Sequence, residues 1–300
     1  MSDIVIGIDL GGTRIKAVAI DRQGNILQRH YLPTNDGDPL FWKNGVANTV
    51  QELGEKNGIS GTVVGISAPG LPNAANSAIA YMPGRLEGLE NFVWTDFLQT
   101  ETYILNDAIA AMMAEARFGA AKNRKNVVML TLGTGVGGAI LIEGKPYQGS
   151  FRKAGHIGHM VIDSEGDQDV TGMPGSLEEV IGNCTISKRT DGRFDSTKEL
   201  LAAYRKGNSF AGEVWLTSVK KLAVGLASIT NILSPELIIL GGGITEAGDD
   251  LFGPLEKYMN LYEWRTGENR TEIVKAQYGD LAGAVGAACF AREADNENKR

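Results

Sequence analysis

Three glycine-rich turns, each placed directly after an apolar run, dominate this sequence. They read "DLGGTRIK" at 9–16, "LGTGVGG" at 132–138 and "LGGGI" at 240–244, and we call them the first, second and third glycine loops. A short apolar run ending in a turn is typical of a buried strand, and α/β folds bind ligands at such strand ends. Glycine turns also leave backbone N–H groups unobstructed for an anion. A single loop would more often be an ordinary hairpin turn, but three favour an α/β protein with a phosphate site.

The second glycine loop contains G-x-G-x-x-G at Gly133, Gly135 and Gly138, the pattern of dinucleotide-binding proteins. In those proteins the loop leads into a helix whose N-terminus holds the pyrophosphate. Here it leads into "AILIEG", which is typical of a strand. The context therefore argues against a dinucleotide oxidoreductase, and a helix at 139–142 would revive that alternative.

The order strand, glycine loop, strand and turn occurs twice, in "IVIGIDLGGTRIKAVAID" and in "NVVMLTLGTGVGGAILIEG". Each copy predicts an antiparallel pair of strands. Apolar periodicity predicts helices at 45–58, 107–120, 213–233 and 281–294. A length of 300 residues favours two domains. We therefore expect two architecturally similar α/β halves, with disorder only in the tail at 294–300.

Charge and composition exclude several classes of protein. The net charge of -7 argues against binding to nucleic acid or to an anionic membrane surface. Cys184 and Cys289 are too few for a disulfide framework or a cysteine metal cluster. The first residues lack the basic segment of a signal peptide, and no apolar run approaches the ~18 residues of a membrane span. The sequence predicts a soluble, cytoplasmic protein.

Six motifs in fixed order carry a family resemblance: "DLGGTRIKAV", "GISAPG", "NDAIAAMMAEARFGA", "LGTGVGGAILIEGKPYQG", "GHIGH" and "LGGGI". Together they resemble the ROK family (repressors, open reading frames and kinases) of the sugar kinase, heat-shock ATPase and actin superfamily. The resemblance implies a two-domain, actin-like ATPase (ribonuclease H-like) α/β fold with a cleft between the domains. A small domain at 1–117, joined by the helix at 281–294, would precede a larger one at 118–280, often in a homodimer. Only eight residues precede Asp9, so we expect no DNA-binding domain.

The resemblance implies an ATP-dependent sugar kinase, glucokinase-like, that moves the γ-phosphate of ATP to a hydroxyl of a hexose or hexose derivative. It assigns Asp107 as the catalytic base, and a carboxylate at a helix N-terminus stays ionised because the helix dipole favours its charge. Without the resemblance, Asp107 could equally be a helix cap. The implied sugar-binding residues are Ser67, Gly70, Asn106, Asp107, His156, His159 and Glu178.

The glycine loops take the nucleotide in this interpretation. The implied ATP-binding residues are Asp9, Gly11, Gly12, Thr13, Lys16, Gly133, Thr134, Gly135, Gly137, Gly241, Gly242 and Gly243. A carboxylate among phosphate donors makes sense if a hydrated magnesium ion must be held as well, so Asp9 is the candidate for Mg²⁺. The expected cofactors are ATP and Mg²⁺, and the expected partners are small molecules.

The segment "GHIGH" departs from the family. Its members usually read Gly-Glu-x-Gly-His, where the Glu binds sugar and the His joins three cysteines around zinc. Here His156 replaces the Glu, and Asp169, Thr171 and Ser176 replace the cysteines. Hydroxyls are poor ligands for zinc, so we expect no zinc and hydrogen bonds that hold the loop instead.

Two departures leave the sugar open. Neutral imidazole at 156 can both donate and accept, whereas a carboxylate only accepts, so the sugar need not be glucose or an N-acetylated hexosamine. Gly84 stands in "YMPGR", where many members read Pro-Asn. A kinase for an amino sugar, a catalytically weak sugar-binding or regulatory relative, and polyphosphate as donor remain alternatives.

Overall fold

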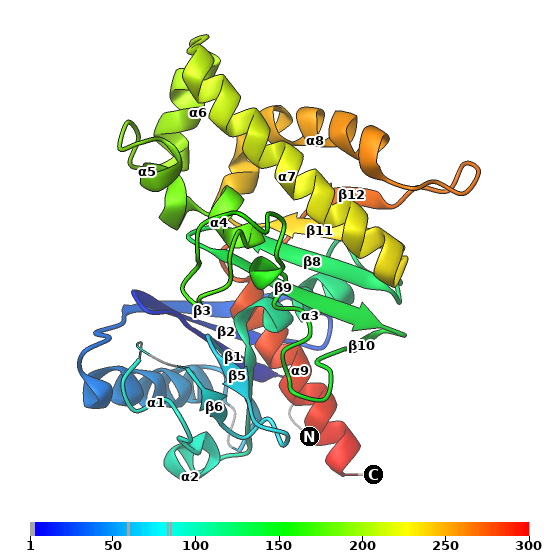
Figure 1. Cartoon of the computed structure of the whole chain (residues 1–300). Helices are drawn as coiled ribbons and strands as arrows, with labels where there is room; N and C mark the ends of the chain where they lie inside the picture. Colours follow the sequence, from blue (N-terminus) through cyan, green and yellow to red (C-terminus); the bar gives the residue numbers. More distant parts are fainter. Residues whose placement is uncertain (1–3, 59–60, 83, 85, 300) are drawn as a thin grey trace. The chain divides into compact units, whose positions relative to one another are not determined.

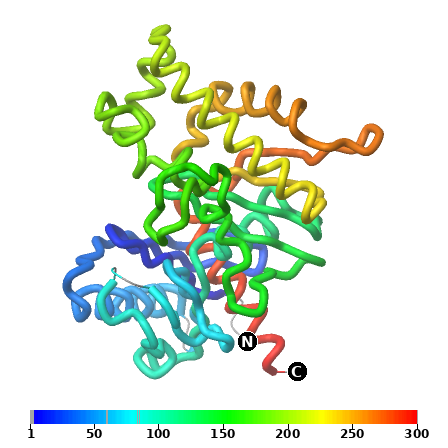
Figure 2. Tube along the Cα trace, viewed as in Figure 1, coloured from blue at the N-terminus to red at the C-terminus, as the bar shows by residue number. Residues whose placement is uncertain are grey.

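The computed structural model describes residues 4–58, 61–82, 84 and 86–299, traced in Figures 1 and 2. The chain forms two compact units. The first comprises Met1–Asn123, Gln148–Lys153 and Gln277–Arg300, and the second comprises Arg124–Tyr147 and Ala154–Ala276. Each unit contains one five-stranded sheet. None of the helices within the described ranges has both the length and the apolar character required to cross a membrane.

The sheet of the first unit has the strand order β3-β2-β1-β4-β7. Its strands are β1 (Val5–Leu10), β2 (Arg14–Ile20), β3 (Ile26–Pro33), β4 (Val64–Ala68) and β7 (Thr102–Asn106), and a separate pair is formed by β5 (Leu71–Pro72) and β6 (Ile79–Tyr81). β1, β2 and β3 form an antiparallel meander. β4 pairs in parallel with β1, and β7 pairs in parallel with β4. The antiparallel pair of strands predicted around the first glycine loop is confirmed, as β1 and β2.

Helices cover both faces of this sheet. They are α1 (Pro39–Lys56), α2 (Trp94–Leu98), α3 (Asp107–Phe118) and α9 (Ala282–Asn298). Side chains of β1 point alternately to the two faces of the sheet and so belong to two apolar cores. Ile6 and Ile8 cluster with Trp42 of α1, whereas Val5 clusters with Ala284 of α9. Gly7 faces α9, and a Cβ there would lie 1.9 Å from the carbonyl oxygen of Ala284. The helix backbone can therefore lie directly on the sheet.

The tail of the chain corrects one expectation. Residues 294–300 were expected to be disordered, but α9 continues to Asn298; Arg300 lies outside the described residues. The amide of Asn298 donates to the hydroxyl of Tyr103 at 2.9 Å, and Lys299 pairs with Asp295 one turn earlier at 2.6 Å. A contact with β7 and an i,i+4 ion pair extend the helix, and neither is visible in the polar composition of the tail.

The sheet of the second unit has the order β10-β9-β8-β11-β12. Its strands are β8 (Val127–Leu132), β9 (Val136–Ile142), β10 (Lys145–Pro146), β11 (Leu237–Gly241) and β12 (Glu272–Lys275). β8, β9 and β10 are antiparallel neighbours, while β11 and β12 add in parallel. This order repeats that of the first unit, so the predicted architectural repeat is confirmed. Residues 139–142 lie in β9, so the helix that a dinucleotide site requires does not follow the second glycine loop.

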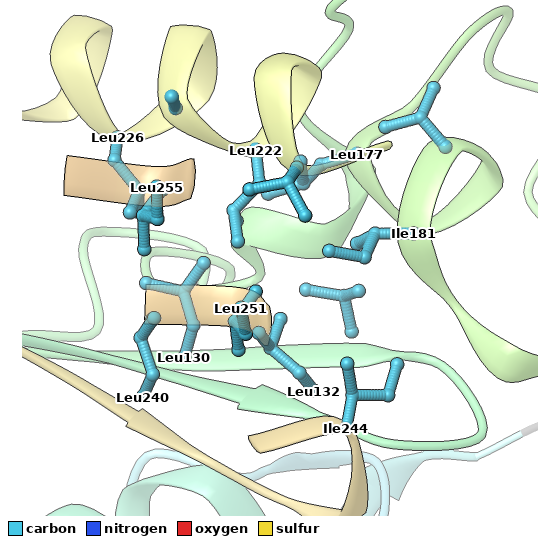
Figure 3. Packing of buried hydrophobic residues seen from close by; sticks show 14 of the residues in the cluster. Leu130, Leu132, Leu177, Ile181, Leu222, Leu226, Leu240, Ile244, Leu251 and Leu255 are labelled. Carbon is cyan, nitrogen blue, oxygen red and sulfur yellow. The ribbon is translucent and has the colours of Figure 1, made fainter. Parts of the chain in front are cut away.

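The second unit contains the short helical turns and helices η1 (Ile157–His159), α4 (Leu177–Ile181), η2 (Asn183–Thr185), α5 (Ile186–Arg189), α6 (Thr197–Arg205), α7 (Ser209–Leu233), η3 (Gly243–Ala247) and α8 (Asp249–Tyr262). Leucines of α7 and α8 pack against leucines of β8 and β11 in one apolar core, as Figure 3 shows. Leu132 and Leu177 are fully buried in this core. They anchor the start of the second glycine loop and the start of α4.

Candidate active site

The junction of β7 and α3 holds two polar side chains in fixed positions. Asn106 is the N-cap of α3, and its carbonyl oxygen accepts a hydrogen bond from the N–H of Ala108 at 3.0 Å. Its amide donates to the carbonyl oxygen of Gly70 at 3.1 Å. Asn106 is only 6% exposed, so both ends of its amide are fixed before any ligand binds. The predicted helix start is confirmed, with Asn106 as the cap.

Asp107 is the first residue of α3 and is exposed. Its carboxylate accepts a hydrogen bond from the N–H of Ala108 at 2.8 Å. The N-terminal end of the helix dipole favours the charged form of a carboxylate there. An exposed carboxylate held in this way can take a proton from a hydroxyl group.

The end of β1 carries a charged cluster around Asp9. One oxygen of Asp9 accepts a hydrogen bond from the hydroxyl of Ser67 at 2.9 Å, and the other accepts from the amine of Lys16 at 3.1 Å. Lys16 also pairs with Asp280 at 3.1 Å. Burial lowers the pKa of Lys16, but the charges and hydrogen bonds of Asp9 and Asp280 outweigh it and raise that pKa above its ordinary value.

Two residues of this cluster modify the sequence interpretation. Ser67 is fully buried and gives its hydroxyl proton to Asp9, so its role with a sugar stays a prediction. Asp280 was not predicted, although it pairs with both Lys16 and Arg14. An acidic residue just before the closing helix, in "GDLAG", was the available signal.

The turn of the first glycine loop is tied internally. The N–H of Gly11 donates to the carbonyl oxygen of Arg14 at 3.3 Å, and the carbonyl of Gly11 accepts from the hydroxyl of Thr34 at 2.6 Å. Gly12 and Thr13 occupy the turn between β1 and β2, and Thr13 is exposed. The loop therefore lies beside the cluster around Asp9, as the sequence order requires.

The second and third glycine loops lie side by side in the second unit. Thr131 is paired with Gly241 across β8 and β11. Gly242 has φ +87°, and a Cβ there would lie 2.3 Å from the carbonyl oxygen of Leu132. Only glycine fits this approach. The structure thus brings together the second and third glycine loops, two of the three loops that contain predicted nucleotide-binding residues. Besides Gly241 and Gly242, the predicted residues of these two loops are Gly133, Thr134, Gly135, Gly137 and Gly243.

Glu178, a predicted sugar ligand, contacts the second glycine loop. It lies in the first turn of α4, whose N-cap is Ser176. Its carboxylate accepts a hydrogen bond from the N–H of Val136 at 2.8 Å. A Cβ on Gly135 would lie 2.2 Å from the same carboxylate oxygen. The glycine at 135 therefore makes room for Glu178, a contact that the motif spacing did not predict.

The paired histidines lie at a 3₁₀ turn. His156 precedes η1 and His159 ends it, with the N–H of His159 donating to the carbonyl oxygen of His156 at 3.2 Å. Burial lowers the pKa of His156, and repulsion between the protonated forms of His156 and His159 lowers it further. His156 is therefore a neutral imidazole near pH 7, able to donate at one nitrogen and accept at the other.

The residues at the family's cysteine positions hydrogen-bond to one another. Nδ1 of His159 lies 2.9 Å from Asp169, and the hydroxyl of Thr171 donates to the same carboxylate at 2.6 Å. These bonds confirm the expected hydrogen-bonded loop. Hydroxyls of Thr171 and Ser176 beside an engaged carboxylate do not fit the tetrahedral N and S ligands of a structural zinc site. Within the described part of the chain, no group of three or more His, Cys, Asp or Glu side chains could hold a metal ion.

Comparisons with known proteins show the family and the fold of the chain. A model of the ROK family matches residues 5–294. A glucokinase from Streptomyces coelicolor is 32% identical to this chain, covering 97% of it and 98% of the relative. A ROK hexokinase from Thermus thermophilus superposes with a TM-score of 0.85 at 24% identity over 98% of this chain and 99% of that one. A ROK family glucokinase from Streptomyces griseus, solved with glucose and AMPPNP, gives 0.78 at 26% identity over 97% and 99%.

The repeated sheets and these neighbours define a two-domain protein of the actin-like ATPase (ribonuclease H-like) fold. Within that class, the chain belongs to the ROK family.

Proposed function

We propose that this protein is an ATP-dependent sugar kinase that phosphorylates a hydroxyl of a hexose or hexose derivative. The observation that carries the proposal is the exposed carboxylate of Asp107 at the N-terminus of α3, beside the capped and buried Asn106. A protein that only bound sugar would have no need of both this base and three glycine loops. The kinase activity of the named relatives supports the same conclusion.

Asp107 is the base in the proposed reaction. The sugar hydroxyl oxygen attacks the γ-phosphorus of ATP, and a new O–P bond forms as the bond from that phosphorus to the β–γ bridging oxygen breaks. The hydroxyl proton passes to the carboxylate of Asp107, and ADP leaves with the bridging oxygen. Asn106 stays in place through its bond to Gly70 and positions the neighbouring sugar hydroxyls.

The glycine loops take the phosphates of ATP in this proposal. Backbone N–H groups of the second and third loops supply donors, and Lys16 supplies a positive charge in the first unit. Preorganised donors of this kind stabilise the charge that develops as phosphate moves.

Magnesium fits beside Asp9 if the ion keeps its own water ligands. The oxygens of Asp9 already accept bonds from Ser67 and Lys16, but each carboxylate oxygen has a further lone pair. Mg²⁺ retains several waters when bound to proteins, and these waters donate hydrogen bonds to carboxylates. When bound with ATP, the ion neutralises charge on the phosphates.

Sugar recognition in the second unit is assigned to His156, His159 and Glu178. The neutral imidazole of His156 stands where the resemblance places a carboxylate, so it sets which sugar is accepted. Ser67, Gly70 and Gly84 complete the residues proposed to influence the sugar from the first unit. We also place the enzyme in the cytoplasm, where ATP is available, and expect a homodimer, which sedimentation analysis tests.

A coupled ADP-release assay over hexoses, hexosamines and polyols tests the proposal. At least one sugar should give sugar-dependent ADP release that requires Mg²⁺. Replacing ATP by polyphosphate in a parallel series tests the donor, with direct detection of the sugar phosphate as readout. Sugar binding without any phosphate transfer would favour the regulatory alternative instead.

A further inference from the structure

The carboxylate of Asp169 is buried and saturated with donors. Its side chain is 0% exposed. One oxygen, Oδ1, accepts from the N–H and hydroxyl of Thr171, at 2.8 and 2.6 Å, and from the N–H of Met173 at 3.1 Å. The other oxygen, Oδ2, lies 2.9 Å from Nδ1 of His159. Each oxygen therefore has its own partners.

Asp169 is ionised in this environment. Burial alone would raise its pKa, but the hydrogen bonds from Thr171 and His159 outweigh burial and hold that pKa below its usual range. An ionised carboxylate only accepts hydrogen bonds. The proton in the contact with His159 must therefore be on Nδ1, whether the imidazole is neutral or charged.

This contact leaves one side of the imidazole for a ligand. The side chain of His159 is 33% exposed while Asp169 is covered, so the ring turns Nδ1 toward the interior. In the neutral ring with a proton on Nδ1, the second nitrogen Nε2 carries a bare lone pair. That nitrogen can accept a hydrogen bond but cannot donate one.

We propose that Asp169 is a positioning residue that fixes the tautomer of His159, so that Nε2 selects a sugar hydroxyl that donates a hydrogen bond. The inference rests on the proposed function and adds a rule of specificity to it. A hydroxyl read in this way cannot be replaced by fluorine, which accepts but does not donate. The deoxyfluoro and the deoxy analogue at that one position should both bind about tenfold or more weakly, since a buried acceptor is left without a partner.

The protonation of His159 can be measured directly by long-range ¹H–¹⁵N correlation on protein with ¹⁵N-labelled histidine. His159→Gln identifies the signals by their loss. In wild-type protein without sugar, at a pH above the histidine titration seen in the same spectra, we expect a protonated Nδ1 and an unprotonated Nε2; a ring still protonated on both nitrogens at the pH of sugar binding would overturn the proposal. A proton on Nε2 with a bare Nδ1 would overturn the proposal, as would zinc bound at Nδ1.

Asp169→Asn provides a matched test because it keeps the shape of the side chain and replaces one acceptor oxygen by an NH₂ donor. The three donors at Oδ1 should hold the amide oxygen in that place, which turns the amide NH₂ toward His159. The tautomer should then reverse, with the proton on Nε2. Sugar affinity should fall about tenfold, while the affinity for an ATP analogue stays within about twofold and confirms folding.

Thr171→Val is the control, since it removes one hydroxyl donor but leaves the carboxylate facing His159. It should keep the wild-type tautomer and sugar specificity. An unchanged tautomer in Asp169→Asn would remove Asp169 from its assigned role. The NMR signals do not depend on turnover. Failure to phosphorylate any sugar would overturn the kinase assignment alone. A proton on Nε2 and none on Nδ1 of His159 in an active wild-type kinase would overturn only this inference.

Discussion

The carboxylate of Glu178 accepts a hydrogen bond from the backbone N–H of Val136, at 2.8 Å. This bond joins a residue assigned to the sugar with a loop assigned to ATP phosphates. Two further hydrogen bonds connect the turn after α4 with the same loop. The N–H of Asn183 donates to the carbonyl of Gly133 at 3.0 Å, and the N–H of Cys184 donates to that of Thr134 at 2.8 Å. A substitution in the second glycine loop should therefore move the carboxylate of Glu178.

Gly135→Ala should impair the binding of sugar as well as of ATP. The new Cβ would lie 2.2 Å from the carboxylate of Glu178 and must displace it. We expect sugar affinity, measured by calorimetry without nucleotide, to fall about tenfold or more. Gly133→Ala is the matched control, because a Cβ there meets nothing within 4 Å. Normal sugar affinity in Gly135→Ala would disprove the structural link.

Asp107→Asn should lower kcat by about 10²–10⁴, the usual contribution of a general base. Helix α3 should still form, because Asn106 is its N-cap and an amide oxygen at 107 can accept from Ala108. The Kd for sugar should therefore change little. Near-normal turnover in this variant would remove Asp107 from the reaction.

Two helix glycines predict opposite effects on stability. A Cβ on Gly286 of α9 would lie 1.6 Å from the carbonyl oxygen of Ala110 in α3, so Gly286→Ala should lower the Tm of the first unit. A Cβ on Gly212 of α7 would meet only the ring of Tyr204, at an ordinary contact distance of 3.4 Å, and Gly212→Ala should raise helix stability by about 0.5–1 kcal/mol. Thermal unfolding measures both. Equal shifts in the same direction would contradict the close packing of α9.

His156 should give sugar binding a pH dependence below the ordinary histidine range. Burial lowers its pKa, so the neutral ring persists as pH falls to about 6.5, and protonation requires a lower pH. Sugar affinity should therefore be constant between about pH 8 and 6.5 and weaken below, since the charged ring can only donate. His156→Glu should shift kcat/KM toward glucose-like or N-acetylated hexoses. Superimposable sugar profiles for the two proteins would assign His156 to loop structure.

The sequence predicted the elements whose patterns are local. The two strand–glycine–strand hairpins followed from short apolar runs, and the start of α3 followed from Asn106 or Asp107 as the candidate cap of an apolar helix; the structure has Asn106 as the cap. The hydrogen-bonded loop around Asp169 followed from the family resemblance, which places Asp169, Thr171 and Ser176 at positions where the family has cysteines. The domain limits at 117 and 118 stay a prediction.

Contacts between distant residues were not predictable, because periodicity carries no information about them. Asp280 pairs with Arg14 across 266 positions, and Glu178 meets Val136 across 42. The helical tail was missed for the same reason. Its polar residues are typical of a disordered segment, and the hydrogen bond from Asn298 to Tyr103 connects it with a strand far away in the sequence.

The most direct test of the central claim is to measure both products of phosphate transfer. ATP, Mg²⁺ and a panel of hexoses, hexosamines and polyols are incubated with the protein, and ADP and sugar phosphate are quantified together. We predict that at least one hexose or hexose derivative yields the two products in equal amounts, and that Asp107→Asn lowers the rates of formation of both by the same factor of about 10²–10⁴. If no sugar phosphate forms in a preparation that binds both sugar and an ATP analogue, the protein is not a sugar kinase.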